Sequence, residues 1–283
     1  MAVDLHTHTT HSDGTCSPRN LLNLAVRKKL KAIAITDHDT TSGNSEALLI
    51  GKKSDVKVIP GVELSVDYPN PHHGHLHLLG LFIDPDNDSL NESLQLLRQE
   101  RHKRNQNILA RLKEFGINIS PEELVSLAGQ GAVGRPHIAR IMVKKGYVSS
   151  VTQAFQLYLK NGAPAYFDRM RLPVDQAIGL IHHAGGISIL AHPNTLAFST
   201  FDELSHSILE LKDRGLDGFE VYCADHGVKT ISEMLEFARD HQMVVSGGSD
   251  FHGDVKPQQD LGSVKVPDRV YHDLVSYWEN RGS

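Results

Sequence analysis

Short apolar runs alternate along this chain with longer segments of helical periodicity. The run from Ala32 to Thr36 is continuous and ends in Asp37-His38-Asp39, which is typical of a strand buried on both faces of a parallel sheet. Comparable runs occupy residues 56–62, 74–82, 187–191, 218–222 and 243–246, and a first strand leads into His6 and His8. The alternation predicts an α/β fold, as one α/β barrel or as two unequal domains.

Helical patterns fill the segments between these strands. Ser17 followed by Pro18 pairs an N-cap residue with proline at the first helical position, and it predicts a helix that begins there. Further helices are predicted at 44–53, 174–184, 202–214, 229–241 and 268–278. The chain therefore has the strand and helix rhythm of a barrel.

Between residues 89 and 166 this rhythm stops and helix follows helix. Helices are predicted at 89–115, 121–127, 135–145 and 151–159. We therefore predict a helical insertion at 89–166, acting as a lid or substrate-selecting unit, in a barrel formed by residues 1–88 and 167–283. The long first helix carries a basic cluster of Arg98, Arg101, Lys103, Arg104 and Arg111. This cluster is either a solvated helix face or, with Arg135, a surface that selects multiply phosphorylated substrates.

Composition narrows the class of protein. The 283 residues are 40% hydrophobic and 22% charged, as in ordinary globular proteins. A net charge of −5 argues against a protein that coats long nucleic acid, although a small anionic ligand is compatible with it. The two cysteines form no disulfide framework, and we find neither a signal peptide nor a membrane-spanning run, so we expect a cytoplasmic protein without membrane contact.

Histidine is the one residue type that is unusually frequent, with 18 residues in the chain. Because alternate side chains of a strand share a face, His6 and His8 can point at one ion. Alone, this pair is weak support for a metal site, but polar residues recur where other core strands end. The candidate ligands are His6, His8, Asp13, His38, Glu63, His77, His192, Asp250 and His252.

Nine ligands are too many for one ion, since a divalent ion takes about four to six. We therefore expect two to three divalent ions, and the imidazole and carboxylate set without thiolate favours Mn, Fe or Zn. Such ions activate water, so the expected nucleophile is a metal-bound hydroxide and no serine or cysteine nucleophile is needed. His75 shares a strand face with His77 and is the alternative ligand there, whereas His72 and His73 are expected to be solvated.

The motifs in which these residues stand resemble those of the PHP (polymerase and histidinol phosphatase) family of metal-dependent phosphoesterases. They are Asp4-Leu5-His6-Thr7-His8 with Ser12-Asp13-Gly14, Thr36-Asp37-His38-Asp39, Gly61-Val62-Glu63, Ala191-His192-Pro193 and Ser249-Asp250-Phe251-His252. The resemblance implies a distorted (β/α)7 barrel. It also implies three ion sites, held by His6, His8, Glu63 and Asp250, by Glu63, His77 and His192, and by Asp13, His38 and His252.

The insertion and the segment Gly134-Arg135-Pro136-His137 are similar to one branch of that family, the nucleoside 3′,5′-bisphosphate phosphatases and short-oligoribonucleotide exonucleases. This similarity implies that Arg135 and His137 reach a substrate phosphate; otherwise they form a helix cap and a surface histidine. His137 and His226 are the candidate proton donors. Members of the branch often carry an arginine soon after the His-Pro pair, where this chain has Asn194-Thr195-Leu196, so its phosphate contacts are expected to differ.

Other functions remain open at this stage. They are a phosphatase of another small metabolite such as histidinol phosphate, an amidohydrolase-like metal hydrolase, and a non-catalytic PHP accessory module. An amidohydrolase would leave the third ligand set unexplained, and an accessory module would be expected to have lost ligand positions. The expected partner is thus a small phosphorylated substrate, a nucleotide or short oligonucleotide, and the oligomeric state is not predicted.

Overall fold

A computed structural model of the protein describes residues 2–69, 75–128 and 133–281. His72 and His73 lie outside these residues. The strands form one mixed sheet in the order β8-β7-β6-β4-β3-β2-β1-β9, with β5 paired to β3. They are β1 (Ala2–Thr7), β2 (Ala32–Ile35), β3 (Lys57–Asp67), β4 (Leu76–Leu81), β5 (Leu172–Pro173), β6 (Ile187–Leu190), β7 (Gly218–Tyr222), β8 (Val244–Gly247) and β9 (Val266–Pro267).

The sheet curves into a nearly closed barrel, so the predicted fold class is confirmed. It closes where β1 meets the segment after β8, since the amide of His8 donates to the carbonyl of Phe251 at 2.9 Å and Thr7 bridges Phe251 in parallel. All the predicted strands are present. The two-residue strands β5 and β9 were not predicted.

The direction of β4 matters for the site. Strand β4 is antiparallel to both of its neighbours, β3 and β6, whereas β1, β2 and β3 are parallel to one another. The first residues of β4 therefore lie at the edge where the neighbouring parallel strands end. His77, near the start of β4, thus reaches the same end of the barrel as Glu63 on β3.

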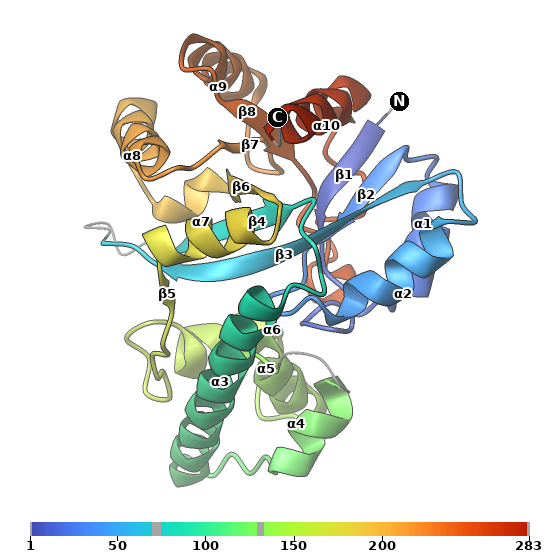
Figure 1. Ribbon diagram of the computed structural model, residues 1–283. Coiled ribbons are helices and arrows are strands. Elements are labelled where there is room, and N and C mark those ends of the chain that lie inside the picture. Colours follow the sequence, from blue (N-terminus) through green and yellow to red (C-terminus); the bar gives the residue numbers. More distant parts are fainter. Residues whose placement is uncertain (1, 70–74, 129–132, 282–283) are drawn as a thin grey trace.

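The helices lie outside the sheet (Figure 1). They are α1 (Pro18–Arg27), α2 (Ser42–Gly51), α3 (Asp88–Glu114), α4 (Pro121–Ala128), α5 (Arg135–Lys144), α6 (Val151–Ala154), α7 (Val174–His183), α8 (Phe201–Asp213), α9 (Val228–Asp240) and α10 (Asp268–Arg281). Ser17 caps α1 as predicted, because its side chain accepts from the amide of Asn20. The helix predicted at 151–159 begins as α6 and continues as a π-helical turn, η1 (Phe155–Leu159).

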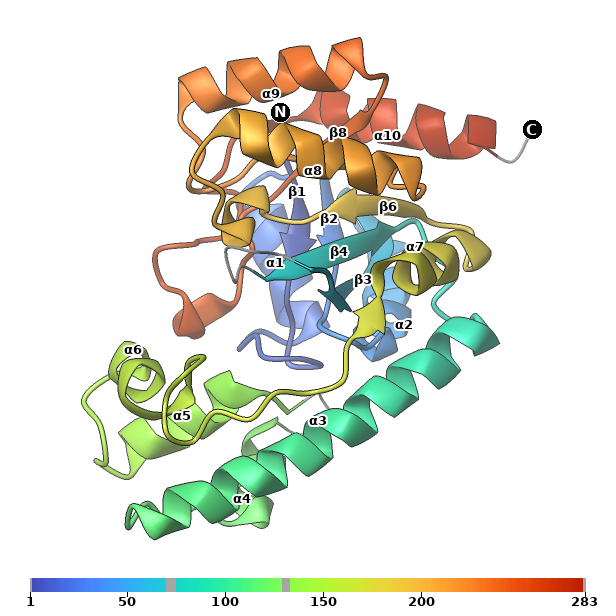
Figure 2. The same ribbon diagram turned by 90° about the vertical axis from the view of Figure 1, so that its left-hand side faces the viewer.

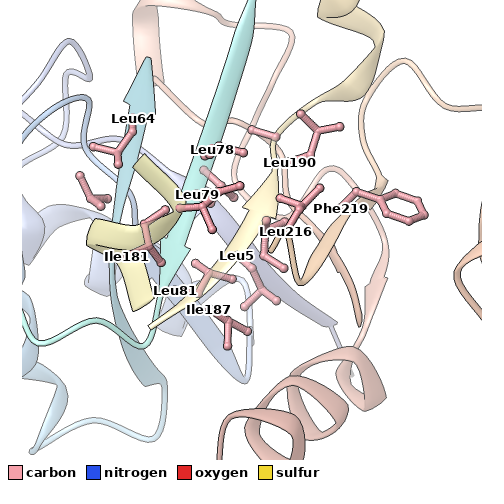
Figure 3. Close-up of a cluster of buried hydrophobic side chains, with 14 of the residues drawn as sticks. Leu5, Leu64, Leu78, Leu79, Leu81, Ile181, Ile187, Leu190, Leu216 and Phe219 are labelled. Atoms are coloured by element: carbon pink, nitrogen blue, oxygen red, sulfur yellow. The ribbon is translucent and has the colours of Figure 1, made fainter. Parts of the chain in front are cut away.

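The main core lies between the sheet and its helices. Side chains from β3, β4, β6, β7 and α7 meet there, including Leu64, Leu79, Leu190 and Phe219, all fully buried (Figure 3). Burial of such side chains is the main stabilising contribution to a fold of this kind, about 1.5–3 kcal/mol each. Among the described residues, no helix is both long and apolar enough to cross a membrane.

Helices α3 to α6 and η1 pack around a second, separate hydrophobic cluster that includes Ile108, Ile138 and Leu159. In Figures 1 and 2 these green helices lie together on one side of the barrel, and in Figure 2 the loops after β1 and β2 face them. The prediction that the basic cluster forms a solvated helix face is confirmed for Lys103 and Arg111, which are exposed. It is wrong for Arg101 and Arg104, which are buried because they share a helix face with Ile108.

Candidate metal centre

The nine predicted ligands come together at one end of the barrel. Glu63 of β3 lies in the middle of them. One of its carboxylate oxygens, Oε1, lies 2.8 Å from Nδ1 of His77 and 2.9 Å from Nε2 of His192. The other, Oε2, lies 3.0–3.3 Å from nitrogens of His38, His8 and His6. A single buried carboxylate is therefore shared by five imidazoles from four strands or strand ends.

Three groups of side chains have ligand atoms that lie within 4.8 Å of one another and could each hold an ion. They are His6, His8, Glu63 and Asp250; His38, Glu63 and His77; and His8, Asp13, His38 and His252. The first group is the one that the family resemblance implies. His192 belongs beside the second group, because it contacts the same Glu63 oxygen as His77. His8 and His38 each lie in two groups, which the sequence did not indicate.

Unpartnered buried atoms test whether these side chains fit metal ions. Within the part of the chain that the structure describes, the buried atoms without a hydrogen-bond partner include His6 Nε2, His8 Nε2, Asp13 Oδ1, His38 Nδ1 and Glu63 Oε2. Buried polar atoms are normally satisfied, and each one left unpaired costs about 1–3 kcal/mol. Five such atoms in one cluster, all of metal-ligating type, are what a set of ligands without its ions would show. The donor set therefore fits divalent cations.

The charges in the cluster are strongly coupled. Burial alone would raise the pKa of Glu63, but the surrounding histidines, His38 first, hold it well below its usual range. Burial alone would lower the pKa of His8, but the carboxylates of Asp250 and Glu63 raise it to about 9. Since a histidine must be neutral to bind a metal, an ion that enters here displaces protons.

Outer residues hold the ligands in place. Glu220 on β7 lies 3.2 Å from Nδ1 of His6 and accepts from the amide of His192 at 2.6 Å. Asp37 accepts from Thr9 and Ser12 in the loop that carries His8 and Asp13. Glu220 was not predicted as a site residue, although a carboxylate inside a buried strand was the available signal.

The backbone is strained at the same strand ends. Asp39, His192 and Asp250 are non-glycine residues with positive φ angles of 51°, 27° and 53°. Such conformations cost about 1–3 kcal/mol each and are concentrated at functional sites. Gly248 is required by close packing, because a Cβ there would meet the amide nitrogen of His6 at 2.5 Å.

A small cavity of about 160 Å³ opens beside the cluster. Asp13, His38 and His77 line one part of it. Its other lining residues include four arginines, Arg101, Arg104, Arg135 and Arg169. A second cavity of about 290 Å³ shares Ser65, His77, Arg135 and Arg169 with the first and extends to Tyr68, Tyr166 and Arg171. The two cavities form a cleft whose cationic side faces the cluster, a geometry suited to an anionic ligand.

The remaining predicted site residues lie as follows. Arg135 stacks on the ring of Tyr166 at 5.1 Å and lines both cavities. His137 is buried, its Nδ1 accepts from the amide of Gly134, and burial lowers its pKa. His226 donates from Nδ1 to the carbonyl of Val221, while its buried Nε2 has no partner in residues 2–69, 75–128 and 133–281. His75 is exposed and lines the larger cavity, whereas His77 lies in the cluster.

Comparisons with known proteins agree with this geometry. The family model described as PHP domain matches residues 4–212. A 5′-3′ exoribonuclease of Escherichia coli K12 is 36% identical over 254 residues, covering 89% of this chain and 85% of that protein. A 3′,5′-nucleoside bisphosphate phosphatase of Chromobacterium violaceum is 30% identical, covering 92% of this chain and 90% of that protein.

Solved structures extend the likeness to the fold. A candidate metal-dependent phosphoesterase from Bifidobacterium adolescentis superposes with a TM-score of 0.86 at 28% identity, covering 97% of this chain and 95% of the other. The match in sequence, fold and clustered His, Asp and Glu side chains gives one conclusion. The chain belongs to the PHP domain family and is a metal-dependent phosphoesterase of that family.

Proposed function

We propose that this protein hydrolyses the phosphate ester of a small nucleotide, with a nucleoside 3′,5′-bisphosphate as the substrate. We further propose that it uses two or three divalent ions, Mn, Fe or Zn, held by the nine residues His6, His8, Asp13, His38, Glu63, His77, His192, Asp250 and His252. The observation that carries the proposal is the joint lining of one cavity by candidate metal ligands and by four arginines.

In this proposal, different residues orient the metal ligands, bind the substrate and donate a proton. When bound, the ions supply an activated water as nucleophile and neutralise the phosphoryl oxygens. Glu220 fixes the ring of His6, and Thr195 contacts Nδ1 of His192 at 3.1 Å, so both imidazoles keep their ring orientation. Arg135 presents a cationic group to the substrate from the junction of the two cavities, where Arg169 is paired with Asp39. His137 and His226 remain the proposed proton donors for the leaving alcohol.

The helical unit at 89–166 supplies the selectivity in this proposal. Arg101 and Arg104 on α3 and Arg135 on α5 all belong to it, and all reach the cavity beside the candidate ligands. Replacing Arg135 with alanine should reduce kcat/KM for a nucleoside bisphosphate much more than for a simple aryl phosphate. Equal reductions of kcat/KM for both substrates would show that Arg135 does not bind the second phosphate.

A second candidate is exonucleolytic hydrolysis of short oligoribonucleotides. The 36% identical relative is named a 5′-3′ exoribonuclease. The larger cavity continues away from the cluster past Tyr68 and Tyr166, and a second nucleotide could occupy it. Aromatic rings of this kind stack on nucleobases. We place this activity second because the arginines and the candidate ligands line the same small cavity.

One activity panel distinguishes these functions. The protein, supplied with Mn, would be tested on a nucleoside 3′,5′-bisphosphate, mononucleotides, short RNA and histidinol phosphate. We expect the highest kcat/KM for the bisphosphate. A preference for histidinol phosphate would redirect the assignment to metabolite phosphatases. A protein that retains fewer than two divalent ions and shows no phosphatase activity would have to be a non-catalytic accessory module.

A further inference from the structure

The cavity beside the candidate ligands contains more positive charge than the described residues neutralise. Asp39 forms an ion pair with Arg101, and its Oδ2 also lies 3.0 Å from Nη1 of Arg169. Arg169 donates in addition to Ser65 Oγ at 2.6 Å. Two of the four arginines therefore share one carboxylate. Arg135 is held by the carbonyl of Leu159 and by aromatic rings, which carry no full negative charge.

Of the four arginines, Arg104 is in the electrostatically least favourable position. It is 5% exposed, and its Nε donates to the side chain of Asn105 at 3.1 Å, while its buried Nη2 has no hydrogen-bond partner among the described residues. Burial and the neighbouring Arg101, Arg169 and Arg135 lower its pKa to about 8. Asn105 is itself fixed by a hydrogen bond to the carbonyl of Val133, so the guanidinium is held in place rather than free to turn outward.

A buried guanidinium with an unpaired donor is costly, and an anionic ligand that accepts from this donor would offset the cost. The ligand must be anionic, fit a cavity of about 160 Å³ and lie next to the candidate metal ligands that line the same cavity. Phosphate meets these conditions, because its oxygens accept two parallel hydrogen bonds from a guanidinium.

We infer that Arg104 binds the phosphate group of the substrate that is not cleaved, and that this contact sets the preference for substrates with a second phosphate. The inference rests on the proposed function and deepens it. Arg104 acts as a specificity residue: it contacts the substrate away from the bond that breaks. Asp39 balances Arg101 and Arg169, so that Arg104 and Arg135 remain for the ligand.

Kinetics with the intact Mn-loaded protein test this inference. Arg104→Met removes the charge while keeping an unbranched apolar stem, and Arg104→Lys keeps one charge. Lys103→Met is the matched control, since Lys103 is on the same helix, exposed and paired with Glu100 outside the cavity. Each variant would be assayed with a nucleoside 3′,5′-bisphosphate and with p-nitrophenyl phosphate. A 5′-phosphorylated dinucleotide and its 5′-hydroxyl counterpart form a second pair.

For Arg104→Met we expect the ratio of kcat/KM for the bisphosphate to that for the aryl phosphate to fall about 10- to 100-fold, the effect of losing charge-assisted hydrogen bonds. Arg104→Lys should recover part of the ratio, and Lys103→Met should keep it within about twofold. The thermal unfolding midpoint of Arg104→Met should equal or exceed that of the wild type, because an unpaired buried cation is removed.

Two results would overturn the inference. One is an unchanged ratio in Arg104→Met; the other is an equal loss on both substrates together with a lower unfolding midpoint, which would make Arg104 a structural residue. If the wild-type protein does not cleave the bisphosphate, the proposed function fails, and the dinucleotide pair then decides about Arg104 alone. In Arg104→Met, a loss of kcat/KM for the phosphorylated dinucleotide alone would support the inference, and an equal loss for both dinucleotides would refute it.

Discussion

Glu220 offers a test of how far the metal centre depends on residues that touch no ion. It is 1% exposed, both of its oxygens lie 3.2 Å from Nδ1 of His6, and one of them also accepts from the amide of His192. Its negative charge, after the opposing effect of burial, is the largest contribution that raises the pKa of His6. Replacing Glu220 with glutamine keeps the shape but removes the charge and turns one acceptor into a donor.

The size of the effect follows from these contacts. In Glu220→Gln, an amide N–H group replaces one of the two oxygens beside Nδ1 of His6, and His6 becomes a less basic ligand. Losing an outer partner of a ligating histidine weakens metal binding by about 10- to 100-fold, or about 1.4–2.7 kcal/mol. The loss should concern the ion held by His6, His8, Glu63 and Asp250, and spare the ion beside Asp13.

Chelator competition followed by metal analysis would measure it. The wild type, Glu220→Gln and Glu236→Gln would be titrated with Mn against a chelator of known affinity. Glu236 is an exposed carboxylate on α9 and serves as the control for a lost surface charge. A dissociation constant for Glu220→Gln within twofold of the wild-type value, in a normally folded protein, would refute the reasoning.

Three further predictions concern other parts of the molecule. His6→Ala and Asp13→Ala should each remove a different ion, measurable as metal content per chain and by spectroscopy of the cobalt-substituted protein. Loss of the same ion in both variants would show that His6 and Asp13 bind one ion. Asp39→Asn leaves Arg101 and Arg169 without their counter-charge and should lower the free energy of unfolding by about 3 kcal/mol in urea titrations; an unchanged midpoint would contradict the charge balance. Burial alone would raise the pKa of Asp217, but His182 and other partners lower it in the folded protein. The ionised carboxylate therefore stabilises the fold above the ordinary pKa of 3.8, and this contribution is lost as the pH falls through the pKa of the folded state. The stability difference between wild type and Asp217→Asn should therefore shrink towards pH 3 in urea titrations, and a constant difference would exclude this role.

The sequence predicts the positions of the core strands well because their signals are local, although β3 continues to Asp67 and so contains Glu63 rather than ending before it. A continuous apolar run that ends in a polar motif, such as Ala32 to His38, identifies both the strand and the edge at which it ends. Six such ends were sufficient to collect the side chains that the structure brings together around Glu63. The helical segment from 89 to 166 was equally clear, because strand patterns are absent from it.

What the sequence could not supply depends on tertiary contacts. The reversed direction of β4 leaves no mark on its residue pattern, and two-residue strands such as β5 are too short to show a period. The buried side of α3 is another case. Arg104 and Lys103 are adjacent and both cationic. Arg104 shares a helix face with Ile108, but arginines are mostly exposed, so its burial could not be expected from its residue type.

The closure of the barrel has a consequence for biosynthesis. Ser249 donates to Asp4, 245 residues earlier in the chain, and Phe251 bridges Thr7, so the ligands on either side of this seam come from opposite ends of the polypeptide. A nascent chain still lacking its last segment can present His6 and His8 but not Asp250 and His252. Two of the three groups of candidate ligands are therefore completed late, since only His38, Glu63 and His77 need no residue from the last segment.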